Sequence, residues 1–493
     1  MNLNSGVKSL VASMVKPKLK ASFKLALLST LAGLPLGTLI FPPQAIAQNA
    51  TIRGEVVFTL TDLAGAEMLA VTKDGRHALV VGAKTATLVA IEDNALTVEG
   101  TWTLTDEFLP AGSADAELTG VSISPDGAFA LIGVKDADDA NLDTFDEMPG
   151  KVVALSLPDL EPLGHVTVGR GPDSVAIAPN GQFAAVANED EENEEDLTNL
   201  ENGAGTVSII DLRRGPNRMT QVEVPIPPDN IPFFPHDPQP ETVRIAADSS
   251  FIVATLQENN AVARIEIPSP LPKRLTPDIF SVQNFDVGVR TGFGLVQDKV
   301  GEGSCRSGSY DLSLRQEFTS AREPDGIAIT PDGRYFVTAD EDNLTNVNNQ
   351  SYEGILLSPH GTRSISVFDA TTGELLGDSG NSIEESIIAL GLPQRCNSKG
   401  PEPEVVSVGV VNGRTLAFVA IERSDAITIH DISNPRNVQL LDTVVLNPDV
   451  VRANQEAGFE PEGIEFIPAT NQVIVSNPEG NAMSLVNINV MPR

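Results

Sequence analysis

One short pattern recurs along this chain and constrains its fold more than any other feature. Each copy is a short apolar strand, then a tight turn, then a second β-rich run. Three copies are almost identical in form: VSISPDG at 121–127, VAIAPNG at 175–181 and IAITPDG at 327–333. Proline fixes φ at the first turn position, and Gly or Asn supplies the left-handed residue that leads back into a strand. Looser copies stand at 69–75, 243–249, 406–413 and 464–471.

The repeated unit predicts an all-β fold, a seven-bladed β-propeller of four-stranded blades. A third strand-like run follows each turn, and a more polar fourth completes several units, as in the blades of a propeller. A β-sandwich, the competing architecture, is not expected to repeat one turn in seven places. The 40 Gly and 35 Pro of the chain suit many turns between short strands.

The two ends of the chain are predicted to meet in one blade. The strand at 52–60 precedes the first unit, whereas the last unit stops after its third strand, 482–488. We therefore expect the N-terminal strand to complete the seventh blade, which leaves few bare strand edges. Residues 48–493 are then a single propeller domain. Loop insertions are expected near 136–149, 189–203, 268–317 and 341–362.

The first 47 residues have the order of a secretory signal peptide. Five lysines and no acids precede an apolar run from Leu25 to Phe41, and Ala45-Ile46-Ala47 has the form of a cleavage site. The alternative is an uncleaved N-terminal anchor, but Gly33, Pro35 and Gly37 interrupt the run. We predict cleavage after Ala47, a secreted or periplasmic location, no membrane span after signal removal, and a monomer.

Charge and cysteine content narrow the function classes further. The chain has 67 Asp+Glu against 33 Lys+Arg, a formal net charge of −34, which argues against a nucleic-acid partner. The two cysteines, Cys305 and Cys396, favour a single disulfide in an oxidising compartment. Two cysteines cannot make a four-cysteine zinc site.

Several stretches resemble known propellers. The Pro-Asp-Gly repeats are similar to the YVTN-type superfamily. Residues 171–212 and 406–435, the latter with NGRTLAF at 412–418 and IHDISNP at 429–435, resemble the choice-of-anchor I family, exported propellers sometimes labelled alkaline-phosphatase-like. The stretch 268–317 has no counterpart in this resemblance. The resemblance implies an exported propeller and no established reaction.

Acidic residues occupy one aligned position in the repeat. The first strand of a blade lines the central channel, so equivalent positions are expected at one height along the axis. Six of the seven residues that stand two before the first aligned strand residue are acidic, whereas composition alone predicts about one. Five of the acids follow a proline, which keeps the backbone extended there. The seven are Glu67, Thr119, Asp173, Glu241, Asp325, Glu404 and Glu462.

So many carboxyl groups around one opening cannot all be ionised unless something offsets their mutual repulsion. Either the pKa values of some of them rise or a cation lies among them. Carboxylate oxygens favour Ca²⁺. We therefore predict a calcium site built from these six acids. The alternative is that each Pro-acid pair only begins its strand and stays solvated. A second acidic layer follows the second strands, at 136–147, 188–196 and 340–343.

Two arginines accompany the acids. Arg170 and Arg322 each stand three residues before the acid of their blade. Either could clamp an anionic substrate, or could simply pair with a neighbouring carboxylate. The sequence has no His-Glu-x-x-His, Gly-x-Ser-x-Gly or Gly-Lys-Ser/Thr motif.

The predicted function is an exported propeller that binds cations at its channel mouth. Its loops would present a site for a small anionic ligand or another exported or cell-surface protein. Whether it is an enzyme stays open. The alternative is a calcium-dependent hydrolase of phosphate esters or lactones, in which the metal polarises the substrate.

Overall fold

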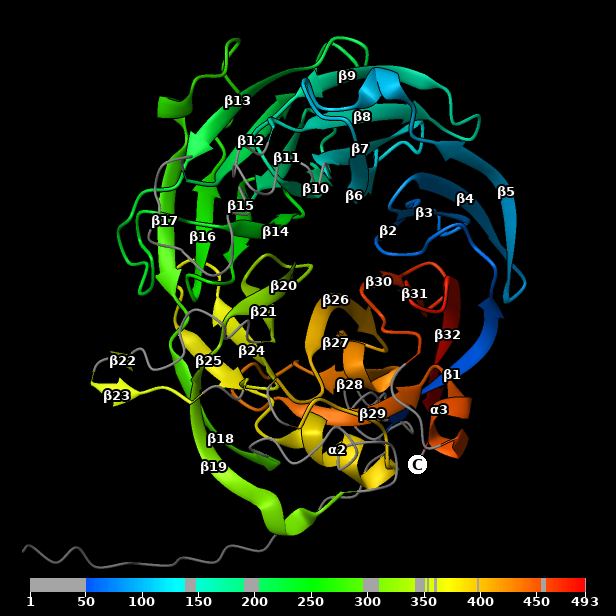
Figure 1. The fold of residues 1–493 in the computed structure, drawn as a ribbon, viewed down its shortest axis with the longest axis vertical. Coiled ribbons are helices and arrows are strands. Elements are labelled where there is room, and N and C mark those ends of the chain that lie inside the picture. The colour runs from blue at the N-terminus through cyan, green and yellow to red at the C-terminus, as the bar shows by residue number, and fades with distance from the viewer. Residues whose placement is uncertain are drawn as a thin grey trace, which may run out of the picture.

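The computed structural model describes residues 50–137, 148–189, 204–295, 310–341, 351–352, 354–358, 361–396, 399–453 and 458–492. Over these residues the chain forms seven four-stranded antiparallel sheets arranged in a ring, which confirms the predicted seven-bladed propeller (Figure 1). The predicted signal peptide, 1–47, lies outside the described residues. No helix in the described part of the chain is long and apolar enough to cross a membrane.

Each blade runs from an inner to an outer strand. Blade 1 contains β2 (Leu69–Val71), β3 (His77–Gly82), β4 (Thr85–Glu92) and β5 (Ala95–Thr103), and blade 2 contains β6 (Ala116–Ile123), β7 (Phe129–Asp136), β8 (Lys151–Ser156) and β9 (Pro162–Thr167). Blade 3 contains β10 (Pro172–Ile177), β11 (Phe183–Asn188), β12 (Thr206–Asp211) and β13 (Thr220–Pro225). Blade 4 contains β14 (Pro240–Ile245), β15 (Phe251–Leu256), β16 (Ala261–Glu266) and β17 (Ser281–Asp286).

The remaining blades follow the same order. Blade 5 contains β20 (Pro324–Ile329), β21 (Tyr335–Asp340), β24 (Ser364–Asp369) and β25 (Leu375–Asp378), and blade 6 contains β26 (Pro403–Val411), β27 (Arg414–Ile421), β28 (Ala426–Asp431) and β29 (Gln439–Val445). Blade 7 contains β30 (Gly463–Ile467), β31 (Gln472–Asn477), β32 (Ala482–Met491) and β1 (Thr51–Leu60).

The N-terminal strand closes the ring, as predicted. β1 pairs antiparallel with β32, from Thr51 opposite Met491 to Leu60 opposite Met483. Figure 1 shows the blue β1 beside the red β32 at the right of the ring.

The repeated turns are held by their own side chains. In the turn after β6, Ser124 Oγ donates to Asp126 Oδ1 at 2.7 Å, and the same carboxylate accepts from the backbone N–H of Ala128 at 3.1 Å. Gly127 has φ of 71°, a conformation that a residue with a Cβ rarely adopts. These contacts explain why the Pro-Asp-Gly pattern recurs between first and second strands.

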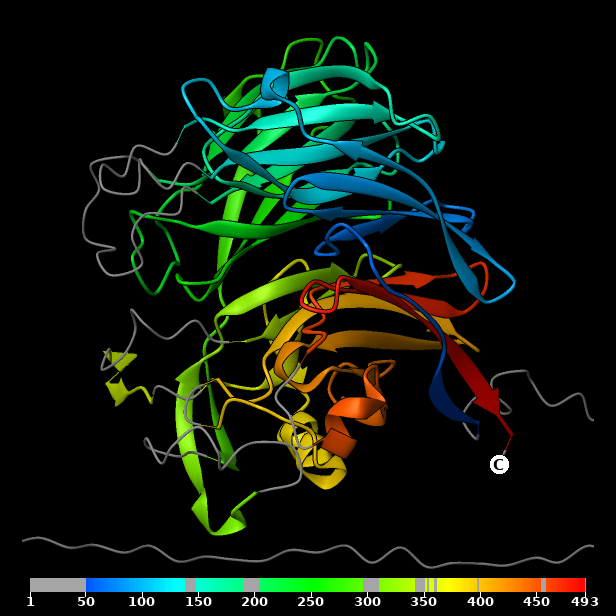
Figure 2. The ribbon, with the colours of Figure 1, turned by 45° about the vertical axis from the view of Figure 1, so that its right-hand side comes forward.

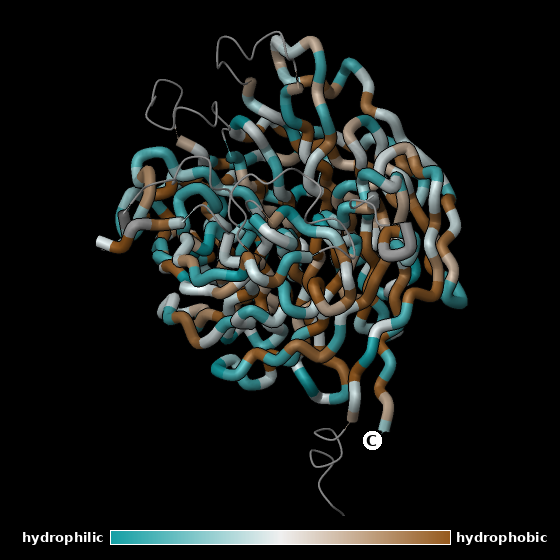
Figure 3. Tube along the Cα trace, turned by 60° about the horizontal axis from the view of Figure 1, so that its bottom comes forward, coloured by the Kyte–Doolittle hydropathy of each residue, from teal (hydrophilic) through white to brown (hydrophobic). Residues whose placement is uncertain are grey.

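The apolar core lies between neighbouring sheets. Between blades 6 and 7, the rings of Phe418 and Phe466 stack with centroids 5.1 Å apart. Hydrophobic segments lie mainly within the body of the ring, and hydrophilic ones mainly at its loops (Figure 3).

Further elements are added to the ring. The two-stranded sheet of β18 (Val289–Leu295) and β19 (Arg315–Ala321) projects beyond blade 5 beside helix α2 (Ser382–Leu390) (Figures 1 and 2). The others are β22 (Ser351–Tyr352), β23 (Ile355–Leu356), α3 (Pro448–Ala453) and the 3-10 turns η1 (Asp106–Phe108), η2 (Pro277–Ile279), η3 (Leu312–Leu314) and η4 (Glu422–Ser424).

A buried ion pair helps to attach α2 to this part of the structure. Arg363 Nη1 lies 2.6 Å from Glu384 Oε1 of α2. Cys396 is disulfide-bonded, and Cys305, the other cysteine of the chain, lies outside the described residues.

Candidate metal centre

The first strand of each blade lines the centre of the ring. β2, β6, β10, β14, β20, β26 and β30 each contact the next one around the circle (Figure 1). The seven residues aligned from the sequence all lie at or just before the start of these strands, except Thr119, which lies within β6. The backbone register shifts directly after the proline that precedes Asp325 and Glu404, and bulges of this kind re-aim side chains.

A glycine lets adjacent blades bring their acids together. A Cβ on Gly326, next to Asp325, would lie 2.6 Å from the carbonyl oxygen of Glu404. Only a glycine therefore allows β20 and β26 to approach this closely.

The six predicted acids form a continuous electrostatic series around the mouth. Beyond the effect of burial, five of them raise the pKa of a neighbour: Glu67 acts on Glu462, Glu462 on Glu404, Glu404 on Asp325, Glu241 on Asp325 and Asp173 on Glu241. The series breaks at Thr119. In that blade the ammonium of Lys135 lies 3.5 Å from Asp173 Oδ1 and supplies a positive charge instead.

Two of the six acids belong to a compact group with a third carboxylate. Asp325, Glu404 and Glu341 each offer an oxygen, and these oxygens all lie within 4.8 Å of one another. Asp325 and Glu341 are each only 5% exposed. Within the described residues, the other four ring acids belong to no such group.

Glu341 is held by polar contacts from two other segments. Gln257 Nε2 donates to Glu341 Oε2 at 2.7 Å, and Lys399 Nζ lies 2.9 Å from Glu341 Oε1. Burial alone would lower the pKa of Lys399, but Glu341, Glu402 and Glu404 together raise it. In the described part of the chain, Lys399 is the one cation that contacts the compact group.

The compact group and the neighbouring Glu241 are short of positive charge. Burial, followed by repulsion from neighbouring carboxylates, raises the pKa of Asp325, of Glu404 and of Glu241 well above the usual range. The pKa of Glu341 is also raised by burial, although Lys399 opposes the shift. One oxygen of Glu404 and one of Glu241 are buried and have no hydrogen-bond partner. The group must therefore carry protons or hold a cation.

A second carboxylate group adjoins the first. Glu402 and Glu422 also lie with Glu341 inside 4.8 Å, and Glu402 is fully buried. Arg423 offsets part of the negative charge of this second group. Its guanidinium lies 3.1 Å from Glu402, 2.8 Å from Glu422 and 2.5 Å from Glu460. Burial, with Glu404 and Glu402, still raises the pKa of Glu422 to about 11.

The backbone before the prolines is strained. Glu323, Glu402 and Glu460 immediately precede the Pro-acid pairs of blades 5, 6 and 7, and their φ values are 43°, 56° and 48°. Non-glycine residues rarely adopt this region, and such outliers cluster at functional sites. The same strained backbone recurs in three neighbouring blades, which indicates that the functional site lies on this side of the channel mouth.

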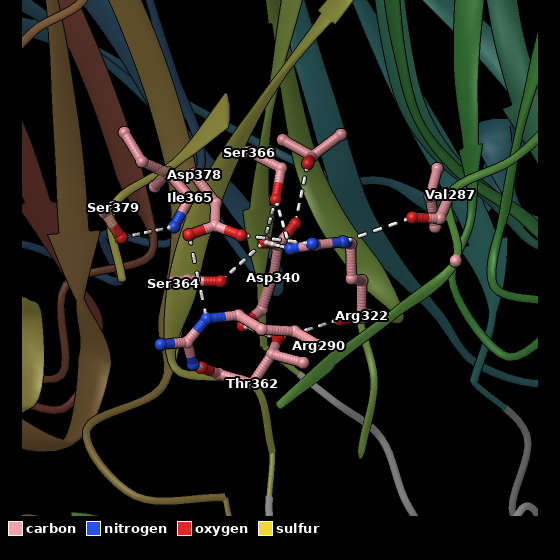
Figure 4. A network of polar contacts seen from close by, with 12 residues as sticks. Val287, Arg290, Arg322, Asp340, Thr362, Ser364, Ile365, Ser366, Asp378 and Ser379 are labelled. Carbon is pink, nitrogen blue, oxygen red and sulfur yellow. Dashed lines mark hydrogen bonds and ion pairs between the residues drawn. The ribbon is translucent and has the colours of Figure 1, made fainter. Parts of the chain in front are cut away.

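The two arginines singled out in the sequence differ in placement. Arg170 is half-buried just before β10. Arg322 is buried, and its guanidinium contacts Ser366 Oγ at 2.7 Å, Asp378 Oδ2 at 3.2 Å and Asp340 Oδ2 at 3.4 Å (Figure 4). Arg322 thus pairs with carboxylates inside blade 5, although not with Asp325.

Sequence reasoning singled out Asp325 and Glu404 but not their closest partners. Glu341 fell within the predicted second acidic layer at 340–343. Glu422 holds the same place after the second strand of the next blade, because Pro324 pairs with Asp340 and Pro403 with Ile421. Aligning the end of the second strand of blade 6 with that of blade 5 would have found Glu422 as well. Of the rest of the predicted layer, Asp136, Asn188 and Asp340 are buried, and 138–147, 190–196 and 342–343 lie outside the described residues.

The structure thus defines a seven-bladed propeller with an acidic channel mouth. The family model for the choice-of-anchor I domain matches residues 67–277 and 356–435, and the chain belongs to this family. Membership of the family suggests a cell-surface protein. No curated protein matches the chain.

Among solved structures, the β-propeller domain of Cps50 (Swd1) from Myceliophteria thermophila is similar at 10% identity and a TM-score of 0.51, over 89% of this chain and all (100%) of that one. Hydrazine synthase from Kuenenia stuttgartiensis matches at 15% identity and a TM-score of 0.48, over 88% of this chain and 97% of that one. The likeness to the Cps50 domain shows the fold alone.

Proposed function

We propose that this protein is an exported propeller that binds calcium at its channel mouth, through Asp325, Glu341 and Glu404. The observation that supports the proposal is the compact group of three carboxylates, with oxygens within 4.8 Å of one another. Glu241 adds a fourth negative charge, and Lys399 offsets one of the four.

The ligand set fits calcium better than magnesium. Magnesium demands near-ideal octahedral geometry and usually keeps several of its waters, which buried carboxylates from three different segments do not readily provide. Calcium instead accepts six to eight oxygens in loose geometry, which suits carboxylates from three different segments. A bound cation would in turn give a small anionic ligand, or the acidic side chains of another exported protein, a contact point at the mouth.

Calcium titration of the full, chelator-treated protein tests the proposal. We expect calcium to raise the melting temperature, because a ligand that binds only the folded state stabilises it. Asp325→Asn and Glu404→Gln, which keep the shape and remove one charge, should weaken calcium binding by about tenfold or more. Glu99→Gln, an acid outside the mouth that pairs with His77, is the control and should bind calcium as the unmodified chain does.

A substitution at Lys399 should have the opposite effect on calcium affinity. The Lys399 ammonium already neutralises part of the negative charge that calcium would neutralise, so Lys399→Met should strengthen calcium binding. A protein that fails to bind millimolar calcium, or variants at Asp325 and Glu404 that bind it unchanged, would refute the proposal.

A further inference from the structure

A second layer of the channel differs in composition from the acidic mouth. Three residues beyond each aligned mouth position, the inner strands carry a small side chain in five blades and a charge in two. Arg244 occupies this position in β14, and Glu465 occupies it in β30. The small residues are Ala70, Ser122, Ala176, Ala328 and Ser407.

The small side chains leave a cavity in the channel. Its volume is about 180 Å³, and Ala70, Ser122, Ala176, Arg244 and Glu465 all line it. At about 30 Å³ per water molecule, it has space for roughly six waters or for one small organic molecule. The two charged residues belong to blades 4 and 7, three places apart, which is the largest separation a seven-membered ring allows.

The two charges face the same cavity without touching. Among the ion pairs of the described residues, none joins Arg244 to Glu465. Arg244 Nη1 donates to the carbonyl of Val243 at 2.9 Å, and Glu465 Oε2 accepts from Ser407 Oγ at a long 3.5 Å. The guanidinium therefore keeps N–H donors, and the carboxylate keeps lone pairs, for a molecule between them.

The electrostatics agree with this geometry. Burial lowers the pKa of Arg244 although Glu465 opposes the shift, and burial raises the pKa of Glu465 although Arg244 opposes it. For each of the two groups, the effect of burial therefore outweighs the attraction of the other. A molecule that contacts both would supply each with the partner it lacks.

We propose that this cavity binds a small zwitterion, an α-amino acid whose carboxylate contacts Arg244 and whose ammonium contacts Glu465. A guanidinium suits a carboxylate because its parallel N–H groups match the two oxygens. Opposite charges on the two walls disfavour a dianion or a dication. The alanine walls and the limited volume favour a small side chain such as that of alanine or serine over an aromatic one.

This site is independent of the proposed calcium centre. It uses residues three positions further along the inner strands and no carboxylate of the compact group. Calcium binding by a Glu465→Gln variant should therefore match that of the unmodified protein, so failure of either proposal can be told from failure of the other.

Isothermal titration of the full chain with L-alanine, in chelator and again in calcium, tests the inference. We expect binding in both conditions, and none by acetate or ethylammonium, each of which carries one of the two charges. Glu465→Gln and Arg244→Gln should each weaken alanine binding by about tenfold or more.

Ala176→Leu fills the cavity without altering a charge, and it should abolish binding while the protein still melts cooperatively. This variant keeps the test valid if a charge variant fails to fold. No binding of alanine, glycine or serine by the unmodified protein would overturn the proposal. Equal binding by Ala176→Leu would overturn it too.

Discussion

Individual carboxylates at the mouth should make stability depend on pH. Burial, with Glu67 and Glu460, raises the pKa of Glu462 to about 7. A carboxyl whose folded-state pKa is raised stabilises the fold below its unfolded pKa, and this contribution is lost as pH rises through the folded value. Without calcium, the melting temperature should therefore fall between about pH 5 and 8.

Two comparisons isolate the cause of this fall. Glu462→Gln cannot titrate, so its melting temperature should fall less steeply over the same range. Calcium, if it replaces protons among these carboxylates, should bind more tightly as pH rises and should flatten the curve. A melting temperature that rises from pH 5 to 8 in chelator would contradict the assignment of raised pKa values to this ring.

At the scale of elements, blade 5 depends on one buried arginine. Arg322 is 2% exposed and joins Asp340 of β21, fully buried, to Ser366 of β24 and Asp378 of β25 (Figure 4). Removing one partner of a buried ion pair leaves an uncompensated charge, which typically costs about 3–5 kcal/mol. We expect Arg322→Met to lower the free energy of unfolding by that amount, as measured by urea denaturation.

An exposed pair in the same blade is the matched control. Arg334 lies 2.7 Å from Asp332, but their side chains are 68% and 47% exposed. Solvent screens such pairs, so Arg334→Met should cost less than about 1 kcal/mol. Equal costs for the two variants would show that the network around Arg322 does not stabilise the blade.

The sequence predicted the elements well because each blade repeats a local signal. The turns at 121–127 and 175–181 predict a second strand directly after each of them, and β7 and β11 begin two residues later, since a turn with proline and glycine fixes where a strand begins. Only part of the compact carboxylate group and its contacts could be predicted from the sequence. Asp325 and Glu404 follow from the repeat, whereas Gln257 and Lys399 meet Glu341 from a different blade and a loop, contacts that no local pattern encodes.

At the scale of the whole molecule, the ring is closed by a strand from the opposite end of the chain. β1 pairs along β32, and it also contacts blade 6, where Gly54 N–H donates to Asp442 Oδ2 at 2.9 Å. Ile52 of β1 is 1% exposed within the core between blades 6 and 7. Without β1, the hydrogen-bonding edge of β32 and this apolar surface would both face water.

We therefore expect a chain that begins at Thr61 to melt at a clearly lower temperature than one that begins at Ala50, and to associate through the bare edge of β32. Size-exclusion chromatography and thermal melting of the two chains measure both effects. A synthetic peptide of residues 51–60 should restore the melting temperature in part, because it can re-form the same register with β32. If the shorter chain stays monomeric and melts like the longer one, the six complete blades hold the ring together without β1.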